Sequence, residues 1–266
     1  MDAWIVLNSI YLIRCKFEYL IYNTLNLLLF KLKIYQKMTM PSLFRRREIL
    51  LPTLLGFVII ILFTVAITLI ILKNMATFLA HNEPVQGQYL IVEGWLSEPA
   101  LLEALTTYKT GGYQFLITTG GPDTRHINPL HETYAEQSAA FIQNRGFDDS
   151  NLIVIATPAS AQNRTFLSAV MVRDWLTANS TVKSTIDVFS GDVHARRTHK
   201  LYKMAFADEI KIGIIAAQAN GFDLQYWWQT SEGAKAVLTE SAGLLWVTCC
   251  FNPGKRGSHQ EKWGIY

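Results

Sequence analysis

The sequence predicts an α/β fold, an open and mostly parallel sheet of about five strands with helices on both faces, preceded by an N-terminal transmembrane helix. Two observations lead to this prediction. From residue 86 onward, short apolar segments rich in β-branched residues alternate with longer helical patterns, which is typical of successive strand and helix units in a parallel sheet. Upstream of them, residues 49–72 form one uncharged apolar stretch.

The apolar stretch 49–72 is long enough to cross a bilayer. As a helix it would extend ~36 Å, against ~30 Å for a hydrocarbon core. Arg45, Arg46 and Arg47 precede it, so the positive-inside rule predicts a cytoplasmic N-terminus and a domain on the other side. A cleaved signal peptide is the competing interpretation, although its apolar region should be shorter. We expect a single-pass protein of a bacterial inner membrane, with a periplasmic or otherwise extracytoplasmic domain.

The segments around this span are assigned by composition. Residues 1–48 are predicted to be a cytoplasmic leader, in which residues 19–30 mix apolar and basic side chains. That segment suits either an interfacial amphipathic helix or a poor second span. A different interpretation is that translation starts at Met38 or Met40. Residues 73–85 are expected to form a linker, residues 86–250 the α/β domain and residues 251–266 a C-terminal tail.

Charge and cysteine content exclude some classes of protein. The net charge of +3 comes largely from the first 50 residues, so it indicates contact with an anionic leaflet rather than with nucleic acid. The three cysteines, Cys15, Cys249 and Cys250, resemble neither a disulfide framework nor a zinc site. Adjacent cysteines rarely bridge, so we expect no disulfide to hold the domain together.

The alternation within the domain predicts each element. Strands are expected at residues 89–93, 115–119, 152–156, 186–190 and 210–216. Helices are expected at about residues 97–110, 132–145, 164–178, 194–206 and 231–248. Gly111, Gly112 and Gly146 stand where C-caps would end the first two helices.

Ligands of open α/β sheets bind beyond the carboxyl ends of the strands, so the loops after the strands are the candidate site. Glu93 ends the first strand, and Gly120 and Gly121 follow the second, where their backbone N–H groups either face an anion or simply form a turn. Arg164 and Thr165 open a helix that either binds an anion or is merely capped. Neither a dinucleotide fingerprint nor a nucleoside triphosphate loop is present.

The loop after the fourth strand carries the most specific signal. The run from Ser190 to Thr198, SGDVHARRT, places His194, Arg196 and Arg197 at a strand-to-helix turn. Arginine binds phosphate and carboxylate groups bidentately, and histidine exchanges protons near neutral pH. The ordinary alternative is a solvated helix start whose cations pair with neighbouring acidic residues.

Taken together, IVEGW, TTGG, the Tyr134-Ala135-Glu136 helix start, RTFLSA and SGDVHARRT resemble the ElyC/SanA/YdcF family over about residues 86–250. The resemblance implies a Rossmann-like fold. It also implies functional positions at the residues that match the family's motifs, which are Gly120, Gly121, Glu136, Thr165, His194 and Arg197. The chain departs from the commoner family pattern at Arg164, Leu167 and Ser168, where many members carry asparagine, glutamate and asparagine.

Members of that family are implicated in peptidoglycan and envelope-polysaccharide homeostasis, with no reaction firmly established. The leading hypothesis is an envelope-biogenesis protein that binds a phosphorylated or anionic glycan precursor, such as a lipid-linked sugar. Arg164, Arg196 and Arg197 would hold phosphate, and Glu136 or His194 would act as acid or base. Whether it also catalyses hydrolysis or transfer at a phosphoester stays open.

Two alternatives remain at this stage. One is a non-catalytic scaffold or sensor for envelope-assembly proteins, in which Trp227 and Trp228 either stack on a sugar or pack in a helix. The other is a domain that binds a nucleotide-like molecule such as S-adenosylmethionine. No cofactor is assigned. No metal is predicted, because His126, His131 and His194 lack a standard ligand spacing, and residues 121–130 suit a lid over the pocket.

Overall fold

The computed structural model describes residues 18–31, 33, 50–123, 131–159, 163–179 and 185–263. It divides into two compact units, Met1–Phe57 and Val58–Tyr266. In the first unit residues 18–31 are helical and exposed. The expectations about Met38, Met40, the three arginines before the apolar stretch, and most of the lid with His126 lie outside the described residues.

Helix α2, Leu54–Leu79, is long and apolar enough to cross a membrane, and its most apolar window buries nothing inside the protein. It begins just after Pro52, and the hydroxyls of Thr64 and Thr68 donate to backbone carbonyls one turn earlier, so neither is left unsatisfied. The helix lies in the middle of the chain and not at its N-terminus, which corrects that part of the prediction. It also continues past Lys73 into the predicted linker, because its last turns find apolar partners in the domain.

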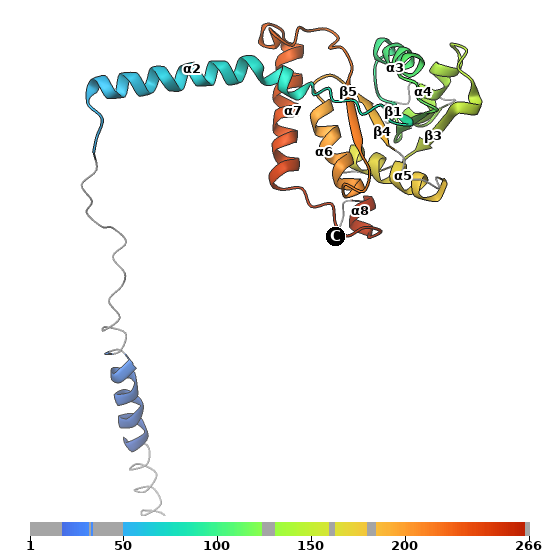
Figure 1. Ribbon diagram of the computed structural model, residues 1–266. Coiled ribbons are helices and arrows are strands. Elements are labelled where there is room, and N and C mark those ends of the chain that lie inside the picture. The colour runs from blue at the N-terminus through green and yellow to red at the C-terminus, as the bar shows by residue number, and fades with distance from the viewer. Residues whose placement is uncertain are drawn as a thin grey trace, which may run out of the picture. The chain divides into compact units, whose positions relative to one another are not determined.

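Five parallel strands form one sheet in the order β3-β2-β1-β4-β5 (Figure 1). Their bounds agree with the predicted ones to within two residues: β1 Tyr89–Glu93, β2 Phe115–Gly120, β3 Leu152–Ala156, β4 Ile186–Ser190 and β5 Ile212–Ala216. This Rossmann-like order reverses direction between β1 and β4. Successive connections therefore leave the sheet on opposite sides at that point.

Helices cover both faces of the sheet, as predicted (Figure 1). They are α3 Glu98–Gly111, α4 Tyr134–Gln143, α5 Arg164–Asn179 and α6 Ala195–Phe206. Alternate residues of β1 serve the two cores: Leu90 and Val92 pack with α3 and α4, whereas Tyr89 and Ile91 pack with α5 and α6. Because both faces are buried, the strands read as apolar runs without polar alternation.

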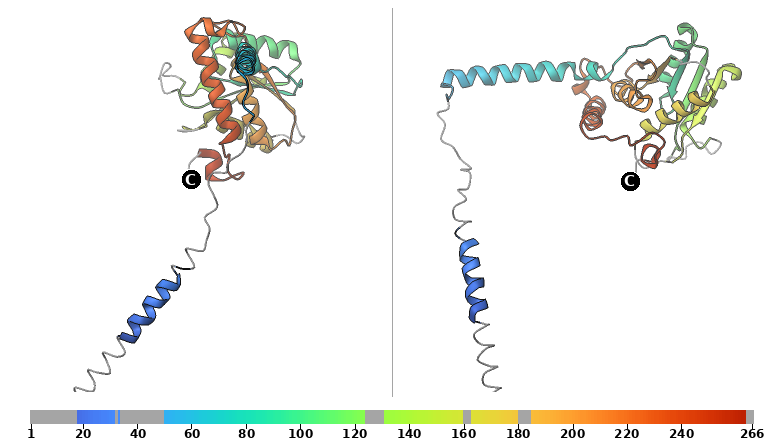
Figure 2. Two further views of the ribbon diagram at one scale, coloured as in Figure 1. Left: turned by 90° about the vertical axis from the view of Figure 1, so that its left-hand side faces the viewer. Right: turned by 60° about the horizontal axis from the view of Figure 1, so that its bottom comes forward.

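Helix α7, Ser231–Cys249, packs beside α6 (Figure 2). The last turns of α2 pack into a hydrophobic cluster that includes residues of α7. Ala76 and Leu79 of α2 are buried against Val193, Trp227 and Val237. The indole Nε1 of Trp227 donates to the carbonyl of Leu72 at 3.1 Å. Trp227 lies in a short 3₁₀ helix, η2 Trp227–Gln229, and is 4% exposed, so packing, rather than sugar stacking, accounts for it; Trp228 stays 45% exposed.

The predicted C-terminal tail is partly structured. Helix α8, His259–Trp263, lies against α5 (Figure 2). There the buried guanidinium of Arg173 donates to both carboxylate oxygens of Glu261 and to the carbonyl of Ala205. A buried guanidinium needs such partners, because charge without them is costly away from water.

Cys249 and Cys250 form a disulfide between adjacent residues, with their sulfur atoms 2.31 Å apart. The expectation that these neighbours do not bridge was therefore wrong. The crosslink joins consecutive residues at the end of α7, so it closes no long loop and is not what holds the domain together.

A buried carboxylate on β4 holds the segment that leads into β1. Asp187, on the inner strand β4, is fully buried and accepts hydrogen bonds from Val85 N (2.7 Å), Gly87 N (2.8 Å) and the hydroxyl of Tyr113 (2.9 Å). Burial, together with the charge of Asp187, raises the pKa of Tyr113, so its hydroxyl remains a donor. Asp187 thereby attaches the segment after α2 to the middle of the sheet.

Replacing Asp187 by alanine is expected to destabilise the protein by about 3–5 kcal/mol, because three buried donors lose their acceptor. Urea denaturation of the detergent-solubilised chain, followed by tryptophan fluorescence, measures the free energy of unfolding. Asp149→Ala, an exposed control, should change it by about 0.5 kcal/mol or less. Equal losses in the two variants would contradict the role given to Asp187.

Candidate functional site

A cavity of about 640 Å³ opens at the carboxyl ends of β1 and β2, beside the starts of α5 and α6 and against α7. This is the point where the strand order reverses, the usual ligand position in such sheets. Seven of the residues predicted from sequence line it: Glu93, Gly120, Gly121, Arg164, Thr165, His194 and Arg197. The walls also include residues that the sequence analysis did not select, among them Trp95, Tyr134, Ser168, Glu240 and Trp246.

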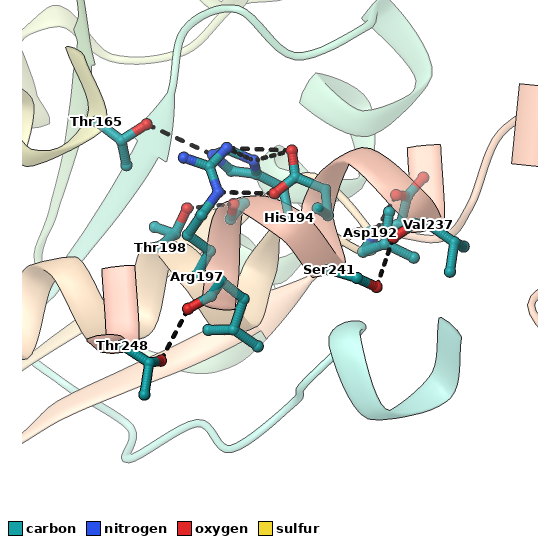
Figure 3. A network of polar contacts seen from close by, with 12 residues as sticks. Thr165, Asp192, His194, Arg197, Thr198, Val237, Ser241 and Thr248 are labelled. Carbon is teal, nitrogen blue, oxygen red and sulfur yellow. Dashed lines mark hydrogen bonds and ion pairs between the residues drawn. The ribbon is translucent and has the colours of Figure 1, made fainter. Parts of the chain in front are cut away.

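His194 is the most connected side chain in the cavity. Its Nδ1 lies 3.0 Å from Oε1 of Glu240 and 2.9 Å from Nη2 of Arg197. Its Nε2 lies on the other side, 3.5 Å from Oγ1 of Thr165 and 3.9 Å from Oε1 of Glu93. Figure 3 shows Thr165, His194 and Arg197 converging on one point, with dashed lines for their contacts.

These two partners of Nδ1 demand opposite proton positions. A carboxylate only accepts a hydrogen bond and a guanidinium only donates one, so Nδ1 can serve Glu240 or Arg197 but not both at once. When Nδ1 carries the proton for Glu240, Nε2 presents a lone pair to the cavity. When Nδ1 accepts from Arg197, Nε2 presents a proton instead. The site can therefore hold His194 as either a base or an acid.

Glu240 fixes Arg197 as well as His194. Its carboxylate accepts from Nε of Arg197 at 2.8 Å and from Nη2 at 3.1 Å, which makes a bidentate pair. A side chain at Gly243 would approach the Arg197 guanidine group to 3.1 Å, so a glycine one turn along α7 leaves room for it. Burial would raise the pKa of Glu240, but hydrogen bonds from His194 and Arg197 outweigh it and lower the pKa to about 2.

Glu93 is a second carboxylate in the site, only 2% exposed. The hydroxyl of Ser190 donates to it, and Oγ1 of Thr198 lies 3.4 Å from its Oε2. Oγ of Ser190 also lies 3.1 Å from Oγ1 of Thr198. Ser190 therefore positions Glu93 but does not itself line the cavity.

The start of α5 gives the cavity its anion-binding character. Arg164 is exposed, and its side chain has no ion pair or hydrogen bond to any described residue. The first turn of α5 contains no acidic residue, so its free backbone N–H groups and the helix dipole both favour a negative group. Nearby, Thr119 is one of the lining residues, and its hydroxyl is buried without a hydrogen-bond partner among the described residues.

Close packing explains why glycines stand at the ends of β1 and β2. A Cβ on Gly120 would stand 2.8 Å from Cβ of Tyr134, and one on Gly94 would stand 2.4 Å from the carbonyl oxygen of Tyr134. Both glycines thus let the start of α4 approach the ends of β1 and β2. Gly121 lies in the cavity wall, where a Cβ would meet Oγ1 of Thr157 at 3.0 Å.

Two of the predicted site residues, Glu136 and Arg196, lie outside the cavity. Glu136 forms a capping box with Thr133 at the start of α4, its Oε2 accepting from Thr133 N at 3.0 Å, and it lies outside the cavity. The pattern Thr133-x-x-Glu136 was a sequence signal for this role. Arg196 turns away to the end of α2, where its guanidinium stacks on Phe78 and donates to that residue's carbonyl.

No protein-family model and no curated protein matches this sequence. The likeness to the ElyC/SanA/YdcF family therefore remains a hypothesis based on motifs, and the cavity has to be interpreted from its own chemistry.

Metal-binding potential lies elsewhere. Among the described residues, His81, Glu83 and His199 could bring three ligand atoms within 4.8 Å of one another, but none of them lines the cavity. His131 also lies outside the cavity walls.

The low pKa of Glu240 predicts a pH-dependent contribution to stability. The carboxyl has an ordinary pKa of 4.5 and a folded pKa of about 2, so its stabilising effect is complete above 4.5 and is lost as the pH falls towards 2. That difference corresponds to about 3 kcal/mol. We expect Glu240→Gln to be less stable than the wild type by about this amount at pH 7, and by progressively less below pH 4.5.

Urea denaturation at several pH values between 7 and 2.5 measures this difference. Glu232→Gln, in the exposed first turn of the same helix, serves as the control and should show no such trend. A difference between Glu240→Gln and wild type that does not change with pH would contradict the assignment.

Proposed function

We propose that the cavity binds the phosphate of a phosphorylated or otherwise anionic cell-envelope glycan precursor, and that His194 exchanges a proton with it. The observation that carries the proposal is that one cavity contains both Arg164, which has no acidic partner among the described residues and opens a helix, and His194, whose Nδ1 is held by the carboxylate of Glu240. One part of the cavity attracts an anion and the other can move a proton.

The three arginines have different parts in this proposal. Arg164 and the N–H groups at the start of α5 hold the phosphate. Arg197 is already neutralised by Glu240, so it orients His194. Arg196 takes no part, since it lies at the end of α2. Thr165 lines the same space, and its hydroxyl supplies a donor for a remaining phosphate or sugar oxygen.

If the protein is an enzyme, the arrangement suits hydrolysis or transfer at a phosphoester. His194 Nε2 would protonate the leaving oxygen or take a proton from the attacking hydroxyl, according to which nitrogen carries the proton. Glu93, held by Ser190 and Thr198 at 3.9 Å from Nε2, would stabilise the imidazolium formed when Nε2 takes a proton. The proposed family would place this activity in envelope biogenesis, on a protein anchored in the inner membrane with its domain in the periplasm.

Binding is tested by thermal unfolding of the full chain in detergent with sugar phosphates, lipid pyrophosphate analogues, nucleotides and S-adenosylmethionine. A phosphorylated glycan is expected to raise the melting temperature by mass action. Arg164→Gln should weaken its binding about tenfold or more, because a charge-assisted contact is worth roughly 1.5–3 kcal/mol. Arg145→Gln, an exposed arginine outside the cavity, is the matched control.

His194→Ala separates catalysis from binding in the same assay. If the variant binds the ligand and has lost turnover, His194 acts in the chemistry. If no ligand produces turnover in the wild type, the protein is a binding or scaffold module. A shift with S-adenosylmethionine and with no phosphorylated glycan would replace the proposal with the nucleotide-like alternative.

The membrane arrangement is tested separately. A reporter enzyme that is active only outside the cytoplasm, fused after Trp263, is expected to be active in bacterial cells, and carbonate extraction should leave the fusion in the membrane fraction. The same reporter inserted after Leu50, before α2, should be inactive. Activity of the early fusion would reverse the proposed orientation.

A further inference from the structure

An apolar groove runs between the last turns of α2 and the second half of α7. It has a volume of about 500 Å³, and its main walls are Ile71, Met75 and Phe78 from α2 and Leu244 and Leu245 from α7. Phe78 is 54% exposed and Leu245 is 66% exposed. Apolar surface of this kind next to a helix that can cross a membrane lies where lipid chains are available.

A basic pocket of about 530 Å³ continues from this groove, because Phe78, Leu244 and Thr248 line both. Its cations come from one face of α6, where Lys200 stands about one turn and Lys203 about two turns beyond Arg196. Neither lysine side chain makes an ion pair or hydrogen bond with a described residue.

The charges of this pocket favour an anion. Its two carboxylates are Glu83, which is paired with His81 at 2.9 Å, and Asp208. Against them stand Arg196 and the two unpaired lysines. The same surroundings oppose a metal ion at His81, Glu83 and His199, since Arg196 Nη2 is 3.3 Å from Nδ1 of His81 and like charges repel.

We propose that the groove and the basic pocket together bind one anionic phospholipid from the bilayer that α2 crosses. Its acyl chain lies in the groove between α2 and α7, and its phosphate lies at Lys200 and Lys203. The inference rests on α2 lying in a membrane, as proposed above, and concerns a site separate from the cavity of His194.

The position of the groove on α2 explains why a lipid is the occupant. The groove begins at Ile71, at the end of the uncharged stretch 49–72, and continues along the same helix to the domain. A chain lying parallel to α2 can therefore enter from the bilayer without crossing water. The two lysines then meet the headgroup, and lysines near a membrane surface are attracted to anionic lipids.

Occupation of this site would also affect the cavity, since both use α7. Ser241, Leu244 and Leu245 face the groove, whereas Glu240 and Trp246, on neighbouring positions of the helix, face the cavity. A bound lipid would hold α7 against α2 and so fix the helix that carries the partner of His194.

The test uses the full chain in a neutral detergent, with dioleoylphosphatidylglycerol or dioleoylphosphatidylcholine added. We expect the anionic lipid to raise the melting temperature, and native mass spectrometry to find one copy retained per chain. The variant Lys200→Gln with Lys203→Gln should bind it about tenfold more weakly. Lys109→Gln with Lys255→Gln, which removes two exposed lysines outside both pockets, should bind it like the wild type.

Ser241→Phe tests the groove, because the added ring would fill it, and should abolish lipid retention. Equal binding of the two lipids, or unchanged binding by the Lys200 and Lys203 variant, would overturn the proposal. So would an equal shift with glycerol phosphate, which has no chain, or a shift with Zn²⁺ that His199→Ala removes. His194→Ala should leave lipid binding intact, so this proposal and the proposed function fail independently.

Discussion

The reversal of strand order between β1 and β4 is the constraint on which the site depends. Both strands run in the same direction, but their following helices leave to opposite faces of the sheet, which opens a gap at their carboxyl ends. Glu93 and His194 reach that gap from adjacent strands although they are far apart in sequence. The glycines that end β1 and β2 let α4 approach, and the start of α5 completes the far wall. The remaining chemistry is arranged around this opening.

Within the cavity the charges are not equivalent, and their pairing decides what each can do. Glu240 compensates Arg197 and orients His194, so a guanidinium that the sequence suggests as a phosphate ligand becomes part of a positioning unit. Arg164 lacks such a partner among the described residues and keeps its charge for a ligand. The separation of an anion-holding side from a proton-moving side is the basis on which we propose phosphoester chemistry, with anion binding alone as its simpler form.

The packing of α2 against the domain uses some of the same helices as the cavity. The end of α2 is no free linker, since Trp227 donates to its backbone and Ala76 and Leu79 are buried against α7 and its neighbours. Arg196, placed one residue before Arg197, is used there and not in the cavity. Adjacent arginines on α6 thus serve opposite sides of the helix, one towards α2 and the other towards α7. Helix α2 and the candidate site are in this way connected through α6 and α7.

The sequence by itself determined the local features of this protein. Apolar β-branched runs predicted all five strands to within two residues, because strands buried on both faces must be continuously apolar. It also placed His194, Thr165 and Arg164 at loops that meet, since parallel strands end at one edge. Only the tertiary structure decided their partners. Glu240 lies on a helix distant in sequence and has no local signal, and the rotation of Arg196 away from Arg197 depends on where α2 packs. Ion pairs between distant elements follow from packing geometry, which short-range patterns do not encode.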